Sequence, residues 1–298
     1  MHSISAKILE TLNNGKRQLG EDALNHLSAF IQSQLLEDQS FKDKSGKSDT
    51  YYTAFGWMLC FVLNIKLNTK KMAEYLSVYN ENELDLIHYA SYKRCQLLHY
   101  LMSKGSLLTW LKTHRKQTIK TLESFRNVPH DDINAPYTQY IWLSLLEDTG
   151  NKLNDSENVS NALKVYQLDE GGYMNVKGGS AATTNASAAA LSVIGQITDY
   201  QFDKSLEFVK KQQHVSGGFL ATGSSPVPDL LSTATALFVL QCYQQSPNYE
   251  AHDFIEAHWS ESGGFIATLL DDESDVEYCF YGLLALGAAQ SNNSDAKR

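Results

Sequence analysis

Three acidic side chains stand where they could take part in chemistry, at the expected starts of helices. Asp229 and Asp275 each begin such a helix, and Glu277 follows two residues after Asp275. A carboxylate at this position can accept hydrogen bonds from free backbone N–H groups and complements the positive end of the helix dipole. Burial could instead keep a carboxyl group neutral, so that it serves as a proton donor. A metal site that joins Asp275 and Glu277 to a histidine such as His258 is a further alternative.

Aromatic side chains on the same helices form a second candidate feature. Their faces stabilise carbocations through cation–π attraction, and they also suit an uncharged apolar ligand. The same residues could instead fill the core between two layers of helices. The candidates for a ligand-binding wall are Tyr51, Tyr52, Phe55, Trp57, Tyr137, Tyr140, Trp142, Tyr278, Phe280 and Tyr281.

An internal repeat predicts the elements that position these side chains. The tripeptides at 171–173, 217–219 and 263–265 all read Gly-Gly-aromatic, at an interval of 46 residues (171 to 217 and 217 to 263). A short apolar helix pattern precedes each pair of glycines. A second helix begins twelve residues after the first glycine of each pair, at Thr183, Asp229 and Asp275. Each repeat therefore reads as a helical hairpin, with a glycine turn that ends the first helix.

Weaker copies of the hairpin occupy the N-terminal half. Phe41 and Asp49 lead into a helix from Tyr51 to Leu63, and the residues at 130–132, His-Asp-Asp, lead into a helix over 137–146. One long helical pattern runs between them from 83 to 102. A hairpin cannot bury both of its faces alone, so successive hairpins must stack.

The sequence therefore predicts an all-α fold, an α/α toroid of inner and outer helices, as a single domain over 1–298. The repeats are clear over 160–290 and divergent over 20–150.

The repeat resembles that of protein prenyltransferase β subunits and squalene-type terpene cyclases. Gln212, Gly217 and Phe219 follow the cyclase pattern of Gln, a short gap and Gly-x-Trp, with Phe in place of Trp. The segment at 41–53 resembles the Asp-Lys-x-Gly-Lys segment that precedes a zinc-ligand helix in the β subunits. The resemblance covers about 27–63 and 110–290. It implies a toroid whose inner helices surround a central cavity.

The zinc site that the resemblance implies is incomplete in this sequence. The transferases hold zinc with an Asp, a Cys two residues later and a distant His, and the zinc activates a thiolate. Asp229 matches the Asp, but Leu231 stands at the Cys position, and Asp275 is followed by Glu277. Tyr52 stands where the family places the ligand His. No cofactor is therefore predicted, although a zinc or magnesium ion held by other residues stays open.

The groups that would bind a prenyl diphosphate are also incomplete. Such binding needs a cluster of cationic side chains. The loop at 220–228 has none, and the loop at 271–273 reads Asp-Asp-Glu, which would repel a diphosphate. Lys42, Lys44 and Lys47 are the concentrated cations in a loop of this kind. The Asp-x-Asp-Asp motif with which class II cyclases protonate an alkene is absent from the sequence.

Composition narrows the remaining classes of protein. The chain has 298 residues, 43% hydrophobic and 20% charged, which is ordinary for a globular protein. Its net charge of −9 disfavours broad binding of nucleic acid or anionic membranes. Cys60, Cys95, Cys242 and Cys279 stand apart with apolar neighbours, as buried reduced thiols do. The most apolar stretch, 51–65, is shorter than the roughly 20 residues that span a bilayer, and no secretory signal is evident, so we expect a cytoplasmic protein.

The leading hypothesis is an isoprenoid-handling enzyme of the terpene cyclase and prenyltransferase superfamily. A cyclase with an atypical acid fits better than a zinc transferase, and it would bind a long hydrophobic chain in the cavity. Asp229, Asp275 and Glu277 would be the catalytic groups at the mouth of the cavity. The substrate-binding residues would be Tyr51, Tyr52, Phe55, Trp57, Tyr137, Trp142, Tyr278 and Tyr281.

Two alternatives stay open. The first is a non-catalytic binding or assembly protein that kept the toroid and lost the chemistry. The second is a zinc-dependent prenyltransferase β subunit whose site is completed by a separate, unknown partner subunit.

Overall fold

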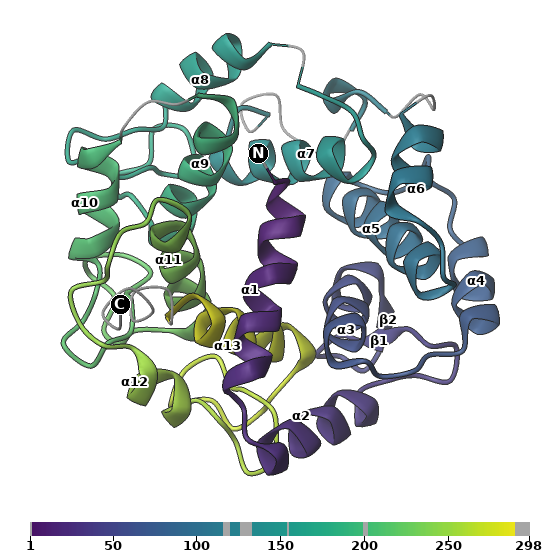
Figure 1. The fold of residues 1–298 in the computed structure, drawn as a ribbon. Coiled ribbons are helices and arrows are strands. Elements are labelled where there is room, and N and C mark those ends of the chain that lie inside the picture. The colour runs from purple at the N-terminus through teal and green to yellow at the C-terminus, as the bar shows by residue number, and fades with distance from the viewer. Residues whose placement is uncertain (1, 116–119, 126–132, 154, 199–201, 290–298) are drawn as a thin grey trace, which may run out of the picture.

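Two concentric layers of helices form a ring around a common centre (Figure 1). The computed structural model describes residues 2–115, 120–125, 133–153, 155–198 and 202–289. The inner layer consists of α3 (Thr50–Leu63), α5 (Leu86–Met102), α7 (Pro136–Asp148), α9 (Thr184–Ile197), α11 (Leu230–Cys242) and α13 (Val276–Ala289). The outer layer consists of α2 (Glu21–Ser33), α4 (Thr69–Ser77), α6 (Leu107–His114), α8 (Ser156–Lys164), α10 (Asp203–Lys211) and α12 (His252–Ala257). The predicted all-α toroid is confirmed.

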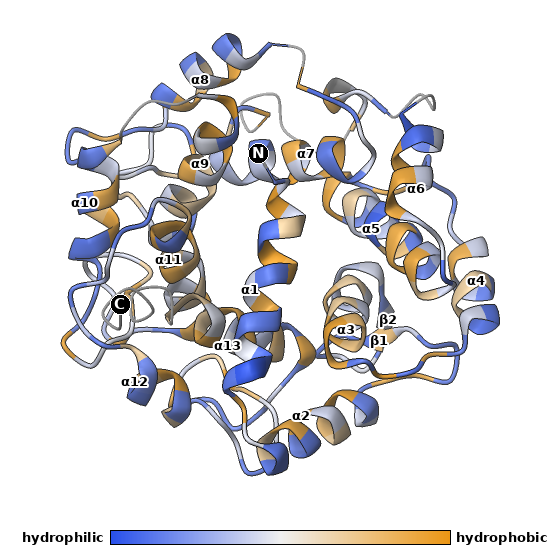
Figure 2. Ribbon diagram, viewed as in Figure 1, coloured by the Kyte–Doolittle hydropathy of each residue, from blue (hydrophilic) through white to orange (hydrophobic). Residues whose placement is uncertain are grey.

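The pattern of apolar residues explains the two layers. The outer helix α10 buries Leu206, Phe208 and Val209 on one side and exposes most of its charged residues. The inner helix α11 instead buries apolar and small residues over most of its surface. A helix with one apolar stripe lies at a surface, and a helix that is apolar on most sides lies inside. Figure 2 shows the same division, with hydrophilic residues along the outside of the ring.

The Gly-Gly-aromatic turns share one geometry. The first glycine of each pair has a positive φ, between 84° and 97°, at Gly171, Gly217 and Gly263. Residues with side chains rarely adopt this conformation. The aromatic residue then bridges the end of the outer helix to the start of the inner one, as Phe219 does between Gln213 and Asp229. Phe219 also donates its backbone N–H to Thr233 Oγ1 on α11 over 2.8 Å.

Contacts at the second glycine show how the ring closes. A Cβ atom at Gly218 would lie 2.3 Å from the ring of Phe254, which belongs to the next outer helix, α12. The last turn has no following repeat, and there Gly264 faces Phe30 of α2 in the same way, at 2.7 Å. The first outer helix therefore takes the place of the helix that would follow the last repeat.

Side-chain caps set the starts of five inner helices. Each cap accepts a hydrogen bond from the backbone N–H three residues later, which satisfies one of the free donors of the first turn. The pairs are Asp49 and Tyr52 (2.9 Å), Asp85 and His88 (2.9 Å), Thr183 and Ala186 (3.1 Å), Asp229 and Ser232 (2.7 Å), and Asp275 and Tyr278 (2.8 Å). The helix starts expected at Thr183, Asp229 and Asp275 are confirmed.

The N-terminal half follows the repeat with local changes. β1 (Phe41–Lys42) and β2 (Ser48–Asp49) form a short antiparallel hairpin in which Phe41 takes the place of the repeated aromatic residue. Helix α5 begins at Leu86, three residues later than expected, because Asp85 caps it. The motif expected at 130–132 lies outside the described residues, and a short 3₁₀ turn, η1 (Leu122–Ser124), precedes it.

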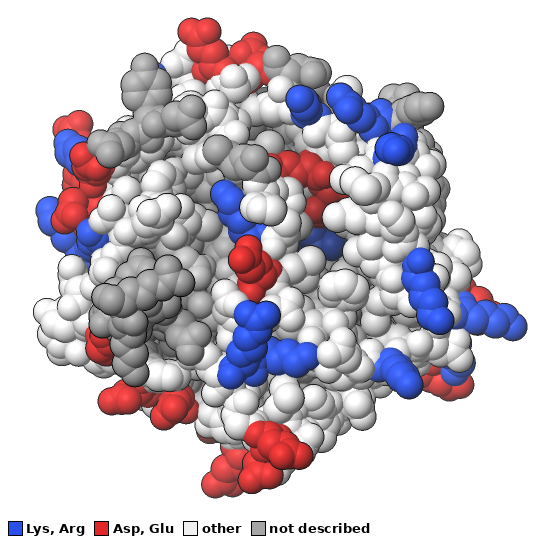
Figure 3. Space-filling model, viewed as in Figure 1, with Lys and Arg blue, Asp and Glu red and all other residues white. Residues whose placement is uncertain are grey.

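A helix that the repeat does not predict crosses the centre of the ring. Helix α1 (Ile4–Gln18) belongs to neither layer and runs over one end of the toroid (Figure 1). It approaches α13 very closely, because a Cβ atom at Gly287 would lie 1.8 Å from the Thr11 carbonyl oxygen. Charged side chains follow α1 across the middle of this face, which is hollowed beside the helix (Figure 3).

Two further expectations can be compared with the described residues. None of the helices there combines the length and the apolar character that a membrane span requires. Cys60, Cys95 and Cys279 are buried free thiols, as expected, whereas Cys242 is exposed. Cys242 is the last residue of α11, so the expectation that all four thiols are buried was wrong at this helix end.

Candidate functional site

Glu277 lies at the end of the ring where the inner helices begin, which we call the mouth and define by Asp49, Asp229, Asp275 and Glu277. Its Oε1 atom accepts a hydrogen bond from the Tyr51 hydroxyl over 2.8 Å. Burial raises the pKa of Glu277 above that of an ordinary glutamate, and the negative charge of Asp275 raises it further. The hydrogen bonds from Tyr51 and Tyr52 lower the pKa but do not cancel the effect of burial. Glu277 therefore keeps its proton to a higher pH than an exposed glutamate.

Aromatic rings surround this carboxyl group. The ring of Tyr51 meets Phe55 edge to face, with centroids 4.8 Å apart, and Phe55 packs on Phe280 at the same distance. Tyr281 lies 5.8 Å from Phe55, measured between ring centroids. Burial holds the pKa of Tyr281 well above its usual value, and the nearby Glu277 adds to the shift. Pairs of rings at these distances and angles are favourable aromatic contacts.

Some residues in the first two turns of the inner helices keep accessible surface. On α13 these half-buried side chains are Glu277, Tyr278 and Tyr281. On α9 and α11 the half-buried Asn185 and Thr235 face each other, and Thr235 Oγ1 donates to Asn185 Oδ1 over 2.8 Å. A spacing of four residues marks one face of a helix. Glu277 and Tyr281 therefore share one face of α13, and that face keeps accessible surface.

Two tyrosines of α7 also keep accessible surface. Tyr137 and Tyr140 are half-buried, and burial raises the pKa of both hydroxyl groups. Each contributes to the raised pKa of Tyr281 on α13. The hydroxyl groups of these tyrosines are therefore poorly hydrated and lie near one another.

The Asp275 carboxylate, two residues before Glu277 in the chain, makes two contacts of its own. One carboxylate oxygen caps Tyr278, and the other lies 3.6 Å from Lys44 Nζ. Lys44 also lies over the ring of Tyr278, 5.2 Å from its centroid. Burial raises the pKa of Asp275, although the Tyr278 hydrogen bond and the Lys44 charge oppose the shift. Lys44 reaches Asp275 across a cleft of about 720 Å³, which separates the turn after β1 from the loop at 271–275.

Asp229 lies one repeat away from Asp275 on α11. Its Oδ1 atom caps Ser232, and burial raises the pKa of the carboxyl group. The site that the sequence predicts thus has two parts. Glu277 lies with Tyr51, Tyr52 and the other aromatic rings, whereas Asp229 belongs to a neighbouring helix start.

The two predicted tryptophans lie away from this group. Trp57 is fully buried, donates its indole N–H to the Gln39 carbonyl oxygen over 2.7 Å and packs against Tyr75 of α4. Trp142 packs against a separate small core that includes Leu86 of α5. Trp57 thus packs toward the outer layer, whereas Trp142 packs among residues of α5, α7 and the segment 122–125. Of the remaining candidates, Tyr52 and Tyr278 are half-buried at the rim of the mouth.

The residues of the family's zinc site do not come together here. Among the described residues, no group of three or more His, Cys, Asp and Glu side chains lies close enough to hold a metal ion. The His258 ring binds the Phe254 carbonyl oxygen through Nδ1 at 2.8 Å, and burial lowers the pKa of His258. In the part of the chain that the structure describes, His258 is therefore not grouped with Asp275 and Glu277.

A histidine that sequence analysis did not single out connects two caps at the mouth. His88 Nδ1 lies 2.8 Å from Asp85 Oδ2, and its Nε2 lies 3.3 Å from Asp49 Oδ2. The hydrogen bonds to Asp49 and Asp85 raise the pKa of His88 to about 9, although burial opposes the shift. The cation thus joins the N-termini of α3 and α5. The two aspartates are 36 positions apart in the sequence, so no local motif marks the cluster.

The chain belongs to the family of prenyltransferase alpha-alpha toroid domains. The model of this family matches residues 67–222 and again 183–296. The two overlapping matches reflect the repeated hairpins of one ring. No curated protein matches the sequence.

Solved structures with the same fold include two kinds of isoprenoid enzyme. Protein geranylgeranyltransferase-I of Candida albicans, complexed with GGPP, has a TM-score of 0.59 at 13% identity, over 89% of this chain and 90% of that chain. A variant of the type II terpene cyclase MstE from Scytonema, in complex with geranylgeranyl dihydroxybenzoate, has a TM-score of 0.54 at 14% identity, over 94% and 97%. A protein from Actinoplanes gives 0.53 at 13% identity, over 91% and 98%. At these identities the likeness shows the fold.

Proposed function

We propose that the protein is an isoprenoid-handling enzyme, a terpene cyclase that starts its reaction by donating a proton from Glu277. The observation that carries this proposal is the position of Glu277. It is a carboxyl group of raised pKa that accepts a hydrogen bond from the Tyr51 hydroxyl. The Tyr51 ring packs on Phe55, which in turn packs on Tyr281. An acid kept neutral by its surroundings, next to surfaces that favour a cation, is what protonation of an alkene requires.

The proposed reaction starts with the acidic proton of Glu277, whose Oε1 atom accepts the hydrogen bond from Tyr51. The proton passes to one carbon of a substrate double bond, and the other carbon becomes a carbocation. A second double bond of the same chain attacks this cation and forms a carbon–carbon bond. Loss of a proton from the last cation to a base completes an isomerisation in which substrate and product have the same composition.

The aromatic residues have a distinct role in this reaction. Tyr51, Phe55, Tyr137 and Tyr281 present ring faces or hydroxyl groups around the space that the cation would occupy. A cation over an aromatic face gains roughly 2 kcal/mol or more when water is excluded. These rings would stabilise each cation and prevent its capture by water. Asp275 would hold the pKa of Glu277 high, since its negative charge disfavours a second charge nearby.

The acidic residues at the mouth favour a substrate with an uncharged head. Asp271, Asp272 and Glu273 follow one another in the loop beside Asp275. Lys42 and Lys44 line the cleft beside this loop, and Lys44 is engaged with Asp275. A polyene hydrocarbon or alcohol would enter such a mouth more readily than a diphosphate, which needs several cations. This feature supports a proton-initiated cyclase over a prenyl transferase.

A non-catalytic binder of hydrophobic chains is the second candidate. The observation that favours it is that Asp229 and Asp275 already serve as helix caps, and that Lys44 also engages Asp275. If Glu277 has only a structural role, the same hollow would hold a ligand and leave it unchanged.

The test is incubation of the purified protein with squalene, shorter polyenes and C10–C30 prenyl diphosphates, followed by product analysis. We expect cyclised polyenes with wild-type protein and none with Glu277→Gln, while both bind the polyene equally. Bound but unchanged polyene with wild-type protein would instead support the binder. Release of diphosphate by wild-type protein would support a transferase.

A further inference from the structure

An apolar groove of about 330 Å³ lies between the loops that lead into α11 and α13. Its third side is formed by the outer helix α12, which lies between α10 and α2 in Figure 1. The apolar lining consists of Val227, Pro228, Phe254, Ala257, Leu269 and Leu270. None of the aromatic residues grouped around Glu277 lines this groove, so it is separate from the candidate site.

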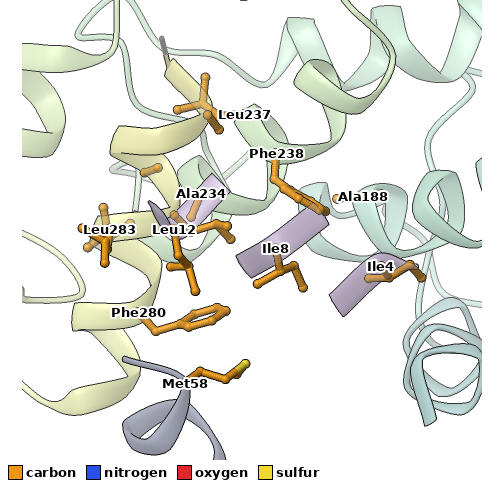
Figure 4. Packing of buried hydrophobic residues seen from close by; sticks show 14 of the residues in the cluster. Ile4, Ile8, Leu12, Met58, Ala188, Ala234, Leu237, Phe238, Phe280 and Leu283 are labelled. Carbon is orange, nitrogen blue, oxygen red and sulfur yellow. The ribbon is translucent and has the colours of Figure 1, made fainter. Parts of the chain in front are cut away.

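Large apolar side chains at this groove are exposed to solvent. Leu270 is 80% exposed, Leu269 61% and Val227 39%. The apolar side of α1 is covered instead: Ile8 is buried, and in Figure 4 it lies among side chains from three inner helices. Apolar residues that gather at a surface beside polar residues mark a site of interaction.

The turn that carries the two leucines does not need them. The same hydrogen bond closes this turn in each of the three clear repeats. The backbone N–H of residues 179, 225 and 271 donates to the carbonyl oxygen three positions earlier, over 3.0, 3.0 and 3.1 Å. The two middle residues are Lys-Gly at 177–178, Gly-Ser at 223–224 and Leu-Leu at 269–270. Because small and charged residues form the same turn, the fold alone does not account for Leu269 and Leu270.

Leu270 also borders the cleft of about 720 Å³ that Lys44 reaches across. Five carboxylates line that cleft, against two lysines. Three of the carboxylates, at 271–273, directly follow Leu270 and are exposed. One repeat earlier the corresponding residues, at 225–227, are Ser-Pro-Val. An apolar groove and an acidic cleft therefore meet at Leu270, in the last repeat alone of the three clear ones.

The two surfaces together define the chemistry of a partner. The volume of the groove is at the lower end of the range that holds a small organic molecule, so it suits one or two apolar side chains. The acidic cleft attracts cations and repels nucleic acid and anionic membranes. We infer that this surface binds a segment of a different protein, in which one or two large apolar residues are followed closely by Lys or Arg. The inference does not rest on the proposed function, because binding here needs no turnover.

The test measures the binding of three fluorescein-labelled peptides by fluorescence anisotropy. The basic peptide is Gly-Leu-Phe-Gly-Arg-Lys-Arg-Gly. The acidic peptide has glutamate at the three cationic positions, and the polar peptide has serine at the two apolar positions. We expect saturable binding of the basic peptide, no binding of the acidic one and weaker binding of the polar one. Added salt weakens the binding of the basic peptide, because it screens exposed charges.

Two variants assign the binding to the surface. Leu270→Ser removes the residue that the groove and the cleft share, and its exposure means that folding survives. The loss of a buried leucine contact lowers affinity for the basic peptide about tenfold. Asp272→Asn combined with Glu273→Gln lowers it about threefold and reduces its dependence on salt.

Matched controls lie at exposed positions outside the groove and the cleft. Val78→Ser changes a valine that is 76% exposed at the end of α4, and Glu157→Gln changes an exposed glutamate on α8. Both keep the affinity of wild type. Unchanged affinity in Leu270→Ser would overturn the inference, as would equal binding of the basic and acidic peptides. Absence of any binding of the basic peptide to wild type would also overturn it.

Sedimentation velocity tests whether a second copy of the chain occupies the groove instead. Helix α6 has exposed Leu107 and Leu108 at its start, shortly after Lys104, so it carries apolar and basic residues together. We expect the same sedimentation coefficient for wild type and Leu270→Ser over a range of concentrations. A dimer that Leu270→Ser dissociates would overturn the assignment to a different protein.

Discussion

The Tyr51 hydroxyl donates a hydrogen bond to Glu277 Oε1 over 2.8 Å, although the two residues are 226 positions apart in the chain. Tyr51 is in the first helix of the inner layer and Glu277 in the last. The contact therefore lies at the seam where the ring closes. Lys44 and Asp275 bridge the same seam at 3.6 Å. The candidate acid exists only when the ring is closed, so the fold and the proposed chemistry depend on the same contacts.

The pH dependence of turnover tests the role of this hydrogen bond. Burial raises the pKa of Glu277, and the Tyr51 hydrogen bond lowers it, because a donor stabilises the carboxylate. As the acid must be protonated to react, wild-type turnover falls as the pH rises through this pKa, above the ordinary glutamate value of 4.5. Tyr51→Phe removes the donor, so the falling limb of the pH profile moves to higher pH. The measurement is the initial rate of polyene cyclisation between pH 4 and 9.

Tyr249→Phe is the control for this profile, since Tyr249 is exposed and far along the chain from the seam. Its profile matches wild type. A Tyr51→Phe limb that stays in place or moves to lower pH would show that Glu277 is not the titrating acid.

The contacts of His88 with Asp49 and Asp85 predict that the stability of the folded protein depends on pH. Its hydrogen bonds to Asp49 and Asp85 raise the pKa of His88 from 6.5 to about 9 in the folded protein. The stabilisation is therefore complete below pH 6.5 and is lost as the pH rises through about 9. His88→Gln lowers Tm at pH 6, and the difference from wild type shrinks by pH 10. Because the side chain is 39% exposed, solvent screens the pair and we expect an effect of at most about 1 kcal/mol.

Thermal unfolding followed by circular dichroism at pH 6, 8 and 10 measures this effect. His252→Gln, at an exposed histidine on α12, is the comparison variant. A His88→Gln deficit that is constant over this range would argue against a protonated His88.

Two turn glycines share a backbone conformation, but we expect an alanine substitution to destabilise the protein to a different extent at each. Gly217 and Gly46 both have positive φ, 93° and 84°. A Cβ atom at Gly217 would lie 2.1 Å from the Glu250 carbonyl oxygen, whereas the space at Gly46 is open within 4 Å. Gly46→Ala therefore costs roughly 1–2 kcal/mol from backbone strain alone. Gly217→Ala costs that amount plus the energy of moving the next repeat, so its loss of unfolding free energy is clearly larger.

Urea unfolding of the two variants measures both losses. Equal losses of unfolding free energy would mean that backbone strain alone requires glycine at position 217, and that close packing between repeats does not.

The repeated half of the ring could be predicted from the sequence because its signals are local. Glycines at φ > 0 and caps such as Asp229 and Asp275 act within a few residues, and their spacing shows directly in the chain. The aromatic positions on the inner helices could be proposed for the same reason. Trp57 and Trp142 looked equivalent to them, but which side of a helix faces the centre depends on neighbours from distant repeats.

The rest of the site depends on contacts that the sequence does not reveal. The Tyr51–Glu277 and His88–Asp49 pairs join separate repeats, and neither follows from spacing. Helix α1 is not part of any repeat. Its apolar spacing, with Ile4, Ile8 and Leu12 four residues apart, indicates an amphipathic helix, but only the closed ring shows where the apolar side docks.

The substitution Gly287→Ala on α13 tests that docking, because the contact with α1 decides whether the substitution raises or lowers the stability of the protein. Glycine within a helix is less favourable than alanine by about 1 kcal/mol, so Gly→Ala in a helix normally stabilises a protein. Here the added Cβ atom would lie 1.8 Å from the Thr11 carbonyl oxygen, a backbone atom of α1 that cannot yield without displacing that helix. We therefore expect Gly287→Ala to lower the unfolding free energy by more than about 2 kcal/mol, in the range of overpacked cores. Amide hydrogen exchange measured by mass spectrometry locates the change: exchange increases in residues 4–18 and stays as in wild type in the outer helix α10. If Gly287→Ala raises stability and protection of 4–18 is unchanged, α1 does not pack against α13 in the folded protein.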